Sequence, residues 1–75
     1  MIRSLTPSEL DQSVDQLVRI CRQGTFTQGS TFLSGLHHID PEAPKQVRAA
    51  LEGASITRSE VAIYQGLIDS FLLSI

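Results

Sequence analysis

The clearest pattern of apolar positions lies in the stretch 56–75 (ITRSEVAIYQGLIDSFLLSI). Its main apolar line advances by three or four residues at a time, through Val61, Tyr64, Ile68, Phe71 and Ile75. This spacing places the side chains on one face of a helix. Thr57 and Glu60 have the spacing of a capping box, in which a hydroxyl and a carboxylate each accept a backbone hydrogen bond. We therefore predict a helix that starts after Thr57. Three further apolar residues widen its stripe: Ile63, Leu67 and Leu72.

A second line on the same predicted helix consists of small residues four apart, namely Ala62, Gly66, Ser70 and Ser74. A glycine inside a helix costs about 0.5–1 kcal/mol relative to alanine. Close approach of another helix along this small ridge would offset that cost; the alternative is that Gly66 is merely tolerated. Leu73 falls on a third side, near Asp69. A helix that is apolar around most of its circumference is usually enclosed by other helices.

One short chain can hardly enclose such a helix, so we predict a homodimer joined through it. The candidate interface residues are Ala62, Tyr64, Gly66, Ser70, Phe71 and Leu73.

The N-terminal third of the chain repeats the same start signal. Thr6 and Glu9 form a second capping-box pair, with Pro7 at the first helical position, where its missing N–H costs nothing. The helix is predicted to run to about Gln23, and Gly24 is expected to stop it. Its apolar face is formed by Leu10, Val14, Leu17, Val18 and Cys21.

The middle of the chain predicts two shorter helices. The first runs roughly from Ser30 to His38, and Phe26 is expected to anchor the connection before it. The second lies within the range Pro41–Gly53 and is best started at Pro44, because a proline further inside would remove a backbone hydrogen bond. Arg48 and Glu52 have the spacing of an ion pair on its outer side.

Composition limits the chain to one small domain, residues 1–75. It has 75 residues, 41% of them hydrophobic and 19% charged, with a net charge of −2. A domain of this size has a marginal core, and oligomerisation is a common remedy. The single cysteine excludes an intrachain disulfide. We predict an all-α fold, a small bundle of three to four helices, completed by homodimerisation.

Location and environment are predicted from what the sequence does not contain. No stretch has the length of a membrane span, and the N-terminal residues lack the apolar core of a signal peptide. We therefore expect a cytoplasmic protein with a reduced thiol and no membrane partner.

The residues capable of chemistry favour structural roles. His37, His38 and Asp40 suggest a metal site, but adjacent helical residues point about 100° apart and no familiar ligand spacing completes the set. Cys21 lies on an apolar stripe, where a free cysteine is usually a small buried hydrophobe rather than a nucleophile. We predict no catalytic residue, no metal and no cofactor, and hence a protein that is not an enzyme.

The function predicted from these features is a small non-enzymatic module that binds proteins through apolar helix faces. Small helical bacterial regulators, co-chaperones and inhibitor proteins have this general build, which is an analogy of size and fold only. Its protein partner is not identified by the sequence. The alternative is a small helical DNA-binding regulator that reads bases with Lys45, Gln46 and Arg48, although six basic residues spread along the chain do not form a basic patch.

Overall fold

The computed structural model describes residues 4–75, and all regular structure in this range is helical. The elements are α1 (Pro7–Gln23), α2 (Phe26–Ile39), α3 (Ala43–Ala50), a single 3-10 turn η1 (Leu51–Gly53) and α4 (Arg58–Leu73). The all-α prediction, with four α-helices in the described residues, is therefore confirmed. The radius of gyration is 11.2 Å, close to the value of about 11 Å expected for a compact chain of this length.

Capping boxes start the first and last helices, as predicted. The backbone N–H of Glu9 donates to Thr6 Oγ1 over 3.1 Å, and Glu9 Oε1 accepts from the N–H of Thr6 over 3.1 Å. Glu60 and Thr57 repeat the arrangement at the start of α4. These bonds satisfy N–H groups that a helix leaves without partners in its first turn. The predicted stop at Gly24 is also confirmed, because α1 ends at Gln23.

The predicted start of α2 is wrong by four residues. The helix begins at Phe26 rather than Ser30, because Thr25 and Gln28 form a third capping box, with both of its hydrogen bonds at 3.3 Å. Gln28 occupies the third helical position, where the other two boxes have glutamate, and its amide oxygen accepts the N–H of Thr25 as the carboxylate would. Phe26 does not anchor the connection: its side chain is 57% exposed.

The bounds of α3 also differ from the prediction. It begins at Ala43, with Pro44 second, and Leu51–Gly53 tighten into η1 instead of continuing the helix. The start is fixed by buried Asp40, whose Oδ1 accepts from the N–H of Glu42 over 3.0 Å, while its carbonyl accepts from Ala43. A side chain of this kind satisfies an N–H group ahead of the first helical turn.

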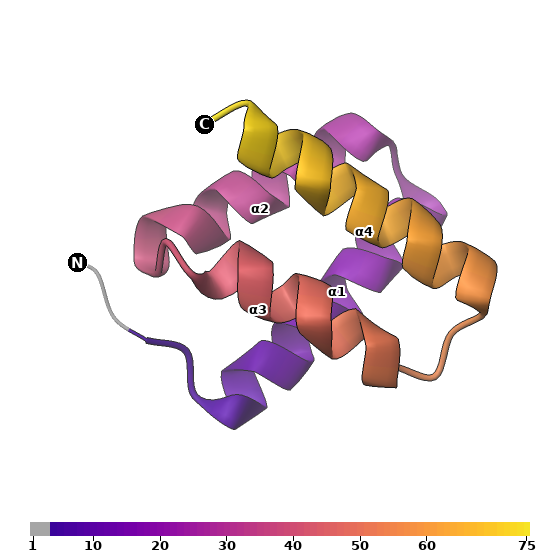
Figure 1. The fold of residues 1–75 in the computed structure, drawn as a ribbon, viewed down its shortest axis with the longest axis horizontal. Helices are drawn as coiled ribbons and strands as arrows, with labels where there is room; N and C mark the ends of the chain where they lie inside the picture. The colour runs from indigo at the N-terminus through magenta and orange to yellow at the C-terminus, as the bar shows by residue number, and fades with distance from the viewer. Residues whose placement is uncertain (1–3) are drawn as a thin grey trace.

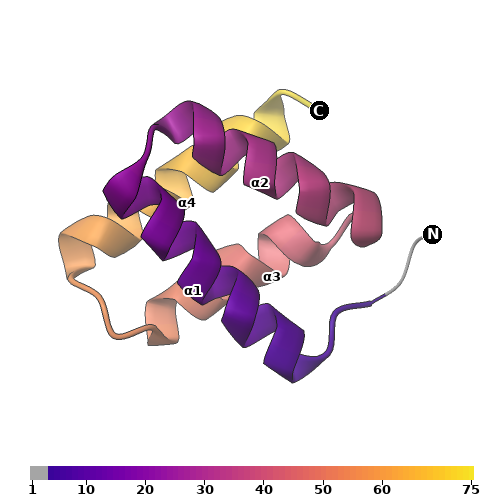
Figure 2. The ribbon, with the colours of Figure 1, turned by 180° about the vertical axis from the view of Figure 1, so that it is seen from behind.

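The helices surround one core to which every element contributes. In Figure 1, α3 and α4 lie in front of α1. Figure 2 gives the view from the opposite side, where α1 lies in front and runs across α3 and α4. Buried hydrophobic residues come from all four helices and from η1: Val14, Leu17, Val18, Leu33, Leu36, Ala43, Val47, Leu51, Tyr64 and Ile68. Among the described residues, no buried side-chain nitrogen or oxygen lacks a hydrogen-bond partner.

Gly29 allows α2 to pack closely against its neighbours. A Cβ atom at this position would lie 2.9 Å from Cδ2 of Leu67 in α4 and 3.3 Å from Sγ of Cys21 in α1. The absence of a side chain therefore lets Leu67 lie directly on the backbone of α2. Gly35, on the same helix, is different, because a Cβ there would meet nothing within 4 Å.

Polar side chains fix α3 against α4. Arg48 Nε donates to Asp69 Oδ1 over 2.7 Å, and the Arg48 carbonyl accepts from Gln65 Nε2 over 2.9 Å. The predicted pairing of Arg48 with Glu52 is wrong: tertiary packing brings the guanidinium within reach of α4 instead. Asp69 is consequently engaged within the chain.

None of the helices in residues 4–75 combines the length and the apolar character needed to cross a lipid bilayer.

The two glycines of α2 are expected to respond oppositely to the same change. Gly29→Leu would push a side chain into Leu67 and should lower the free energy of unfolding by about 1–3 kcal/mol. Gly35→Leu meets no neighbour and gains helix propensity, so it should raise that free energy by up to about 1 kcal/mol. Urea unfolding followed by circular dichroism measures both variants. An equal effect of the two substitutions would contradict the close contact at Gly29.

Candidate functional site

Three sides of α4 are occupied by the rest of the chain. Tyr64 and Ile68 point into the core and are buried. Gln65 and Asp69 bind α3. Leu67 lies on the backbone of α2 at Gly29. The fourth side faces outward and is the candidate functional surface.

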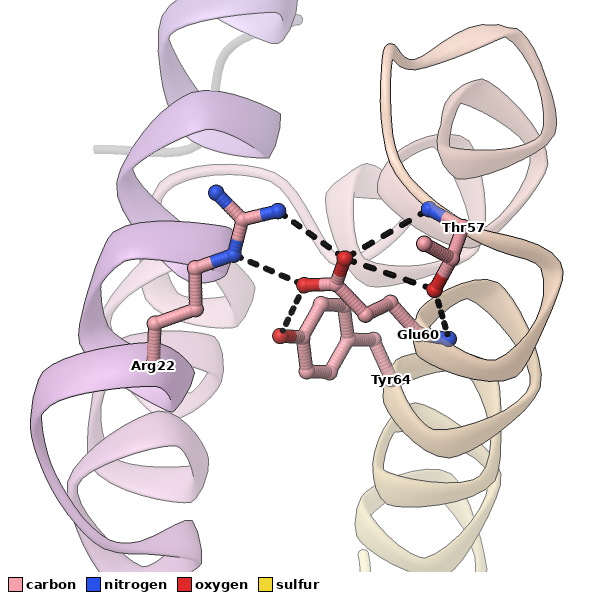
Figure 3. A network of polar contacts seen from close by, with 4 residues as sticks. All are labelled: Arg22, Thr57, Glu60 and Tyr64. Carbon is pink, nitrogen blue, oxygen red and sulfur yellow. Dashed lines mark hydrogen bonds and ion pairs between the residues drawn. The ribbon is translucent and has the colours of Figure 1, made fainter.

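The start of α4 is joined to the end of α1 by the carboxylate of Glu60 (Figure 3). Arg22 donates to both carboxylate oxygens, from Nε over 2.7 Å and from Nη2 over 2.9 Å, and the Tyr64 hydroxyl donates to Oε2 over 2.9 Å. The same carboxylate accepts from the N–H of Thr57 in the capping box. A bidentate Arg–carboxylate pair fixes orientation as well as distance.

These hydrogen bonds stabilise the ionised form of Glu60. The bond from Arg22, followed by that from Tyr64, lowers the pKa of the carboxyl group from 4.5 to about 2. The pKa of Arg22 is raised by the same contact. The pKa of the Tyr64 hydroxyl is also raised, first because burial disfavours phenolate and then because of the neighbouring Glu60 carboxylate.

The predicted interface residues divide into two groups. Ala62, Gly66, Ser70 and Leu73 are all exposed on the outward side of α4. Tyr64 is only 5% exposed and belongs to the core, so it offers little contact area to another molecule. Phe71 is half-buried; its ring meets that of His37 in α2 edge to face, with centroids 6.2 Å apart.

Two large apolar residues are exposed on this side of α4, and one of them, Ile63, extends the surface beyond the predicted set. Ile63 was expected to widen the inward stripe, but its side chain is 49% exposed. Leu73, at the end of α4, is 89% exposed. We use the name outward face for the set Ala62, Ile63, Gly66, Ser70 and Leu73, all of which are uncharged. A Cβ added to Gly66 would meet nothing within 4 Å, so this glycine does not pack against its own chain.

The charged residue beside the outward face is already neutralised. Asp69 borders it and forms its ion pair with Arg48 over 2.7 Å. Arg58, the first residue of α4, is exposed and forms no ion pair in the part of the chain that the structure describes. The outward face is thus a strip without charge, with one free cation at its N-terminal end.

The thiol of Cys21 is poorly placed for nucleophilic chemistry. It is half-buried beside Gly29, and burial raises its pKa, which disfavours the reactive thiolate. Gly29 and His37 are eight residues apart on α2, a separation of about 12 Å along the helix axis. His37, which lies against Phe71, is therefore not positioned as a base for Cys21. Within residues 4–75, no three His, Cys, Asp or Glu side chains group closely enough to hold a metal ion.

One surface cleft lies between α1 and the segment that joins α3 to α4. It has a volume of about 370 Å³, with Val14 and Val18 in its lining and Asp11, Asp15 and Arg22 among its charged residues. Asp15 is paired with Arg19, and Arg22 with Glu60. Two of the charged residues in its lining are therefore engaged in ion pairs within the chain, beside the apolar side chains of Val14 and Val18.

Compared with protein-family models, curated proteins and solved structures, the chain matches none. Its function has to be inferred from its own residues.

The Glu60 contacts predict a specific loss of stability in acid. A carboxyl group whose pKa is lower in the folded chain stabilises that chain above its unfolded pKa, and the contribution disappears as the pH falls towards the folded value. The free energy of unfolding of Glu60→Gln should therefore lie below that of the unmodified chain at pH 7. The difference should shrink between about pH 5 and pH 2.

Glutamine retains the capping-box oxygen, so this comparison isolates the charge. Urea unfolding at a series of pH values gives the difference, and Arg22→Gln provides the matched background. In that background Glu60→Gln should have a smaller and less pH-dependent effect, because Arg22 is the main cause of the shift. A difference that stays constant from pH 7 to pH 2 would rule out this role for Glu60.

Proposed function

We propose that this chain is a non-enzymatic interaction protein, of adaptor, co-chaperone or inhibitor type, that acts through the outward face of α4. The observation that supports this proposal most directly is the exposure of Ile63 and Leu73 on a strip without charge. Exposed apolar strips bordered by polar residues are typical of protein–protein contacts. The proposed compartment is the cytoplasm, where the lone Cys21 would stay reduced.

We further propose that one occupant of this face is a second copy of the chain. Ala62, Gly66 and Ser70 are exposed, and a Cβ at Gly66 would meet nothing within 4 Å. Gly66 carries a cost in helix propensity of about 1 kcal/mol. A helix backbone that approaches Gly66 closely would gain packing energy that a larger residue would prevent. Helical interaction modules commonly bury such a face against another helix.

DNA binding is the alternative class and receives less support. Lys45 lies 3.7 Å from Glu42, and Arg48 is bound to Asp69. The proposed reading helix α3 has 8 residues, of which Ala43, Pro44 and Val47 are buried. A reader of duplex DNA needs cations that are available to phosphates.

The DNA alternative is tested by retention on immobilised duplex DNA at rising salt. We expect little retention even at low salt, and no further loss in the double variant Lys45→Gln, Arg48→Gln. Strong retention that falls steeply with salt, and falls again in this variant, would favour the DNA alternative over the proposed function.

The dimer proposal is tested by one substitution on the open side of α4. Gly66→Leu adds no clash within the chain, so the fold should persist, but it blocks close approach of a second helix. We expect the dimer dissociation constant to rise by about tenfold or more, since the loss of close packing should cost about 1.4 kcal/mol or more. Light scattering over a dilution series measures the change.

Gly35→Leu is the matched control, because it places the same side chain at another exposed helical glycine with open space around it. It should leave the dissociation constant unchanged. A dimer that is equally stable in Gly66→Leu would show that the small ridge is not the contact. A chain that stays monomeric at every concentration would contradict the homodimer.

A further inference from the structure

The side chains of the outward face have a symmetric order of sizes. Positions 63, 66, 70 and 73 advance by three, four and three residues, so they form one straight line along α4. The large residues Ile63 and Leu73 stand at its ends, and the small residues Gly66 and Ser70 stand between them. The centre of the line is level with Ile68, which is buried on the opposite side. Such a line can pack against a copy of itself, large residue on large and small on small.

We infer that two copies of α4 pack antiparallel, about a twofold axis level with residue 68. This inference rests on the homodimer proposed above and adds its geometry. Ile63 of each chain faces Leu73 of the other, and Gly66 faces Ser70. The contact is isologous, so one surface serves both subunits and the assembly closes at two. The two backbones approach most closely at the centre, where the side chains are small.

Charge favours the antiparallel direction over the parallel one. In a parallel pair the two Arg58 side chains would meet at the positive ends of both helices. In the antiparallel pair the two Arg58 side chains are at opposite ends, and each lies about 7 Å along the axis beyond the C-terminal end of the other α4, whose unpaired carbonyl groups carry partial negative charge. Asp69 does not oppose this arrangement, because its ion pair with Arg48 neutralises it within its own chain.

The size of the face predicts a reversible dimer. A helix of 16 residues is about 24 Å long and about 10 Å wide, which gives a footprint of about 240 Å². Stable interfaces bury about 800 Å² per partner, so α4 alone would form a weak pair. Phe26 is 57% exposed and lies one helical turn before Gly29, on which Leu67 rests. Exposed apolar residues outside the outward face, Phe26 among them, would have to enlarge the contact for a stable dimer to form.

Disulfide trapping distinguishes the two directions. The experiment uses a Cys21→Ser background with Ile63→Cys or Leu73→Cys, oxidised at a concentration where light scattering detects the dimer. In the antiparallel pair, two identical positions lie about 15 Å apart along the axis, beyond the Cα separation of about 7 Å that a disulfide allows. Each variant alone should therefore stay uncross-linked, whereas an equimolar mixture should yield a disulfide-linked dimer. Gly35→Cys in the same background is the control for random collision.

The cross-linking pattern and the mass by light scattering together decide between the possible arrangements. Cross-linking of the mixture but of neither variant alone supports the antiparallel pair. Cross-linking of Ile63→Cys with itself and of Leu73→Cys with itself overturns it in favour of a parallel pair. A dimer by light scattering in which no combination cross-links above the Gly35→Cys control overturns pairing through α4, while the homodimer stands. A monomer at all concentrations overturns the proposed homodimer itself.

Discussion

The rest of this structure depends on the packing of α4 against the core through its own residues Tyr64 and Ile68. A chain of 75 residues hides only about 60% of its unfolded surface, so no helix can be spared from the core. Leu17, Leu33 and Leu51 reach the same core from α1, α2 and η1. Without α4, these leucines would lose their cover on one side. The inward half of α4 is therefore committed to the fold, and only its outward half is available for contact with another molecule.

Polar contacts determine how α4 lies on that core. Apolar packing alone would tolerate some rotation of the helix about its axis, because neighbouring aliphatic side chains can exchange positions at modest cost. Arg22 binds Glu60 at one end, and Arg48 binds Asp69 further along. Each pair is partly exposed, where ion pairs add little to stability. Their directional hydrogen bonds instead fix the rotation of α4, and that rotation decides which side chains face outward.

The sequence was most informative where structure is set locally. The capping boxes at Thr6 and Thr57 were predicted because two side chains three residues apart define them. The box at Thr25 was missed because the glycines and threonines that follow it argue against a helix, and Gly29 owes its presence to Leu67, far along the chain. The partner of Arg48 was wrong for the same reason: local spacing favours Glu52, but the packing of α3 on α4 supplies Asp69. The width of an apolar stripe is likewise not a local property, which is why Ile63 was assigned to the wrong side.

The outward face is also a property of the tertiary structure. The sequence shows that its small residues share one line of α4, but not whether that line faces the core or the solvent. With Ile63 and Leu73 exposed, α4 is apolar on a side that its own chain does not cover. An isolated exposed leucine needs no explanation, since folded proteins leave much apolar surface in contact with water. The outward face differs from an isolated exposed leucine in three respects. Its residues are uncharged, its large side chains lie at the two ends with the small ones between them, and the neighbouring carboxylate of Asp69 is paired with Arg48. Each of these features lowers the cost of bringing a second helix onto the line. The pairing of Asp69 with Arg48 also holds α4 on α3, but the order of large and small residues on the exposed side does not contribute to the core. Selection for the core alone would leave those positions free to carry charge, as the exposed positions of α1 do. The proposed contact with another molecule would account for an uncharged outward face on α4, which the packing of the core alone does not require.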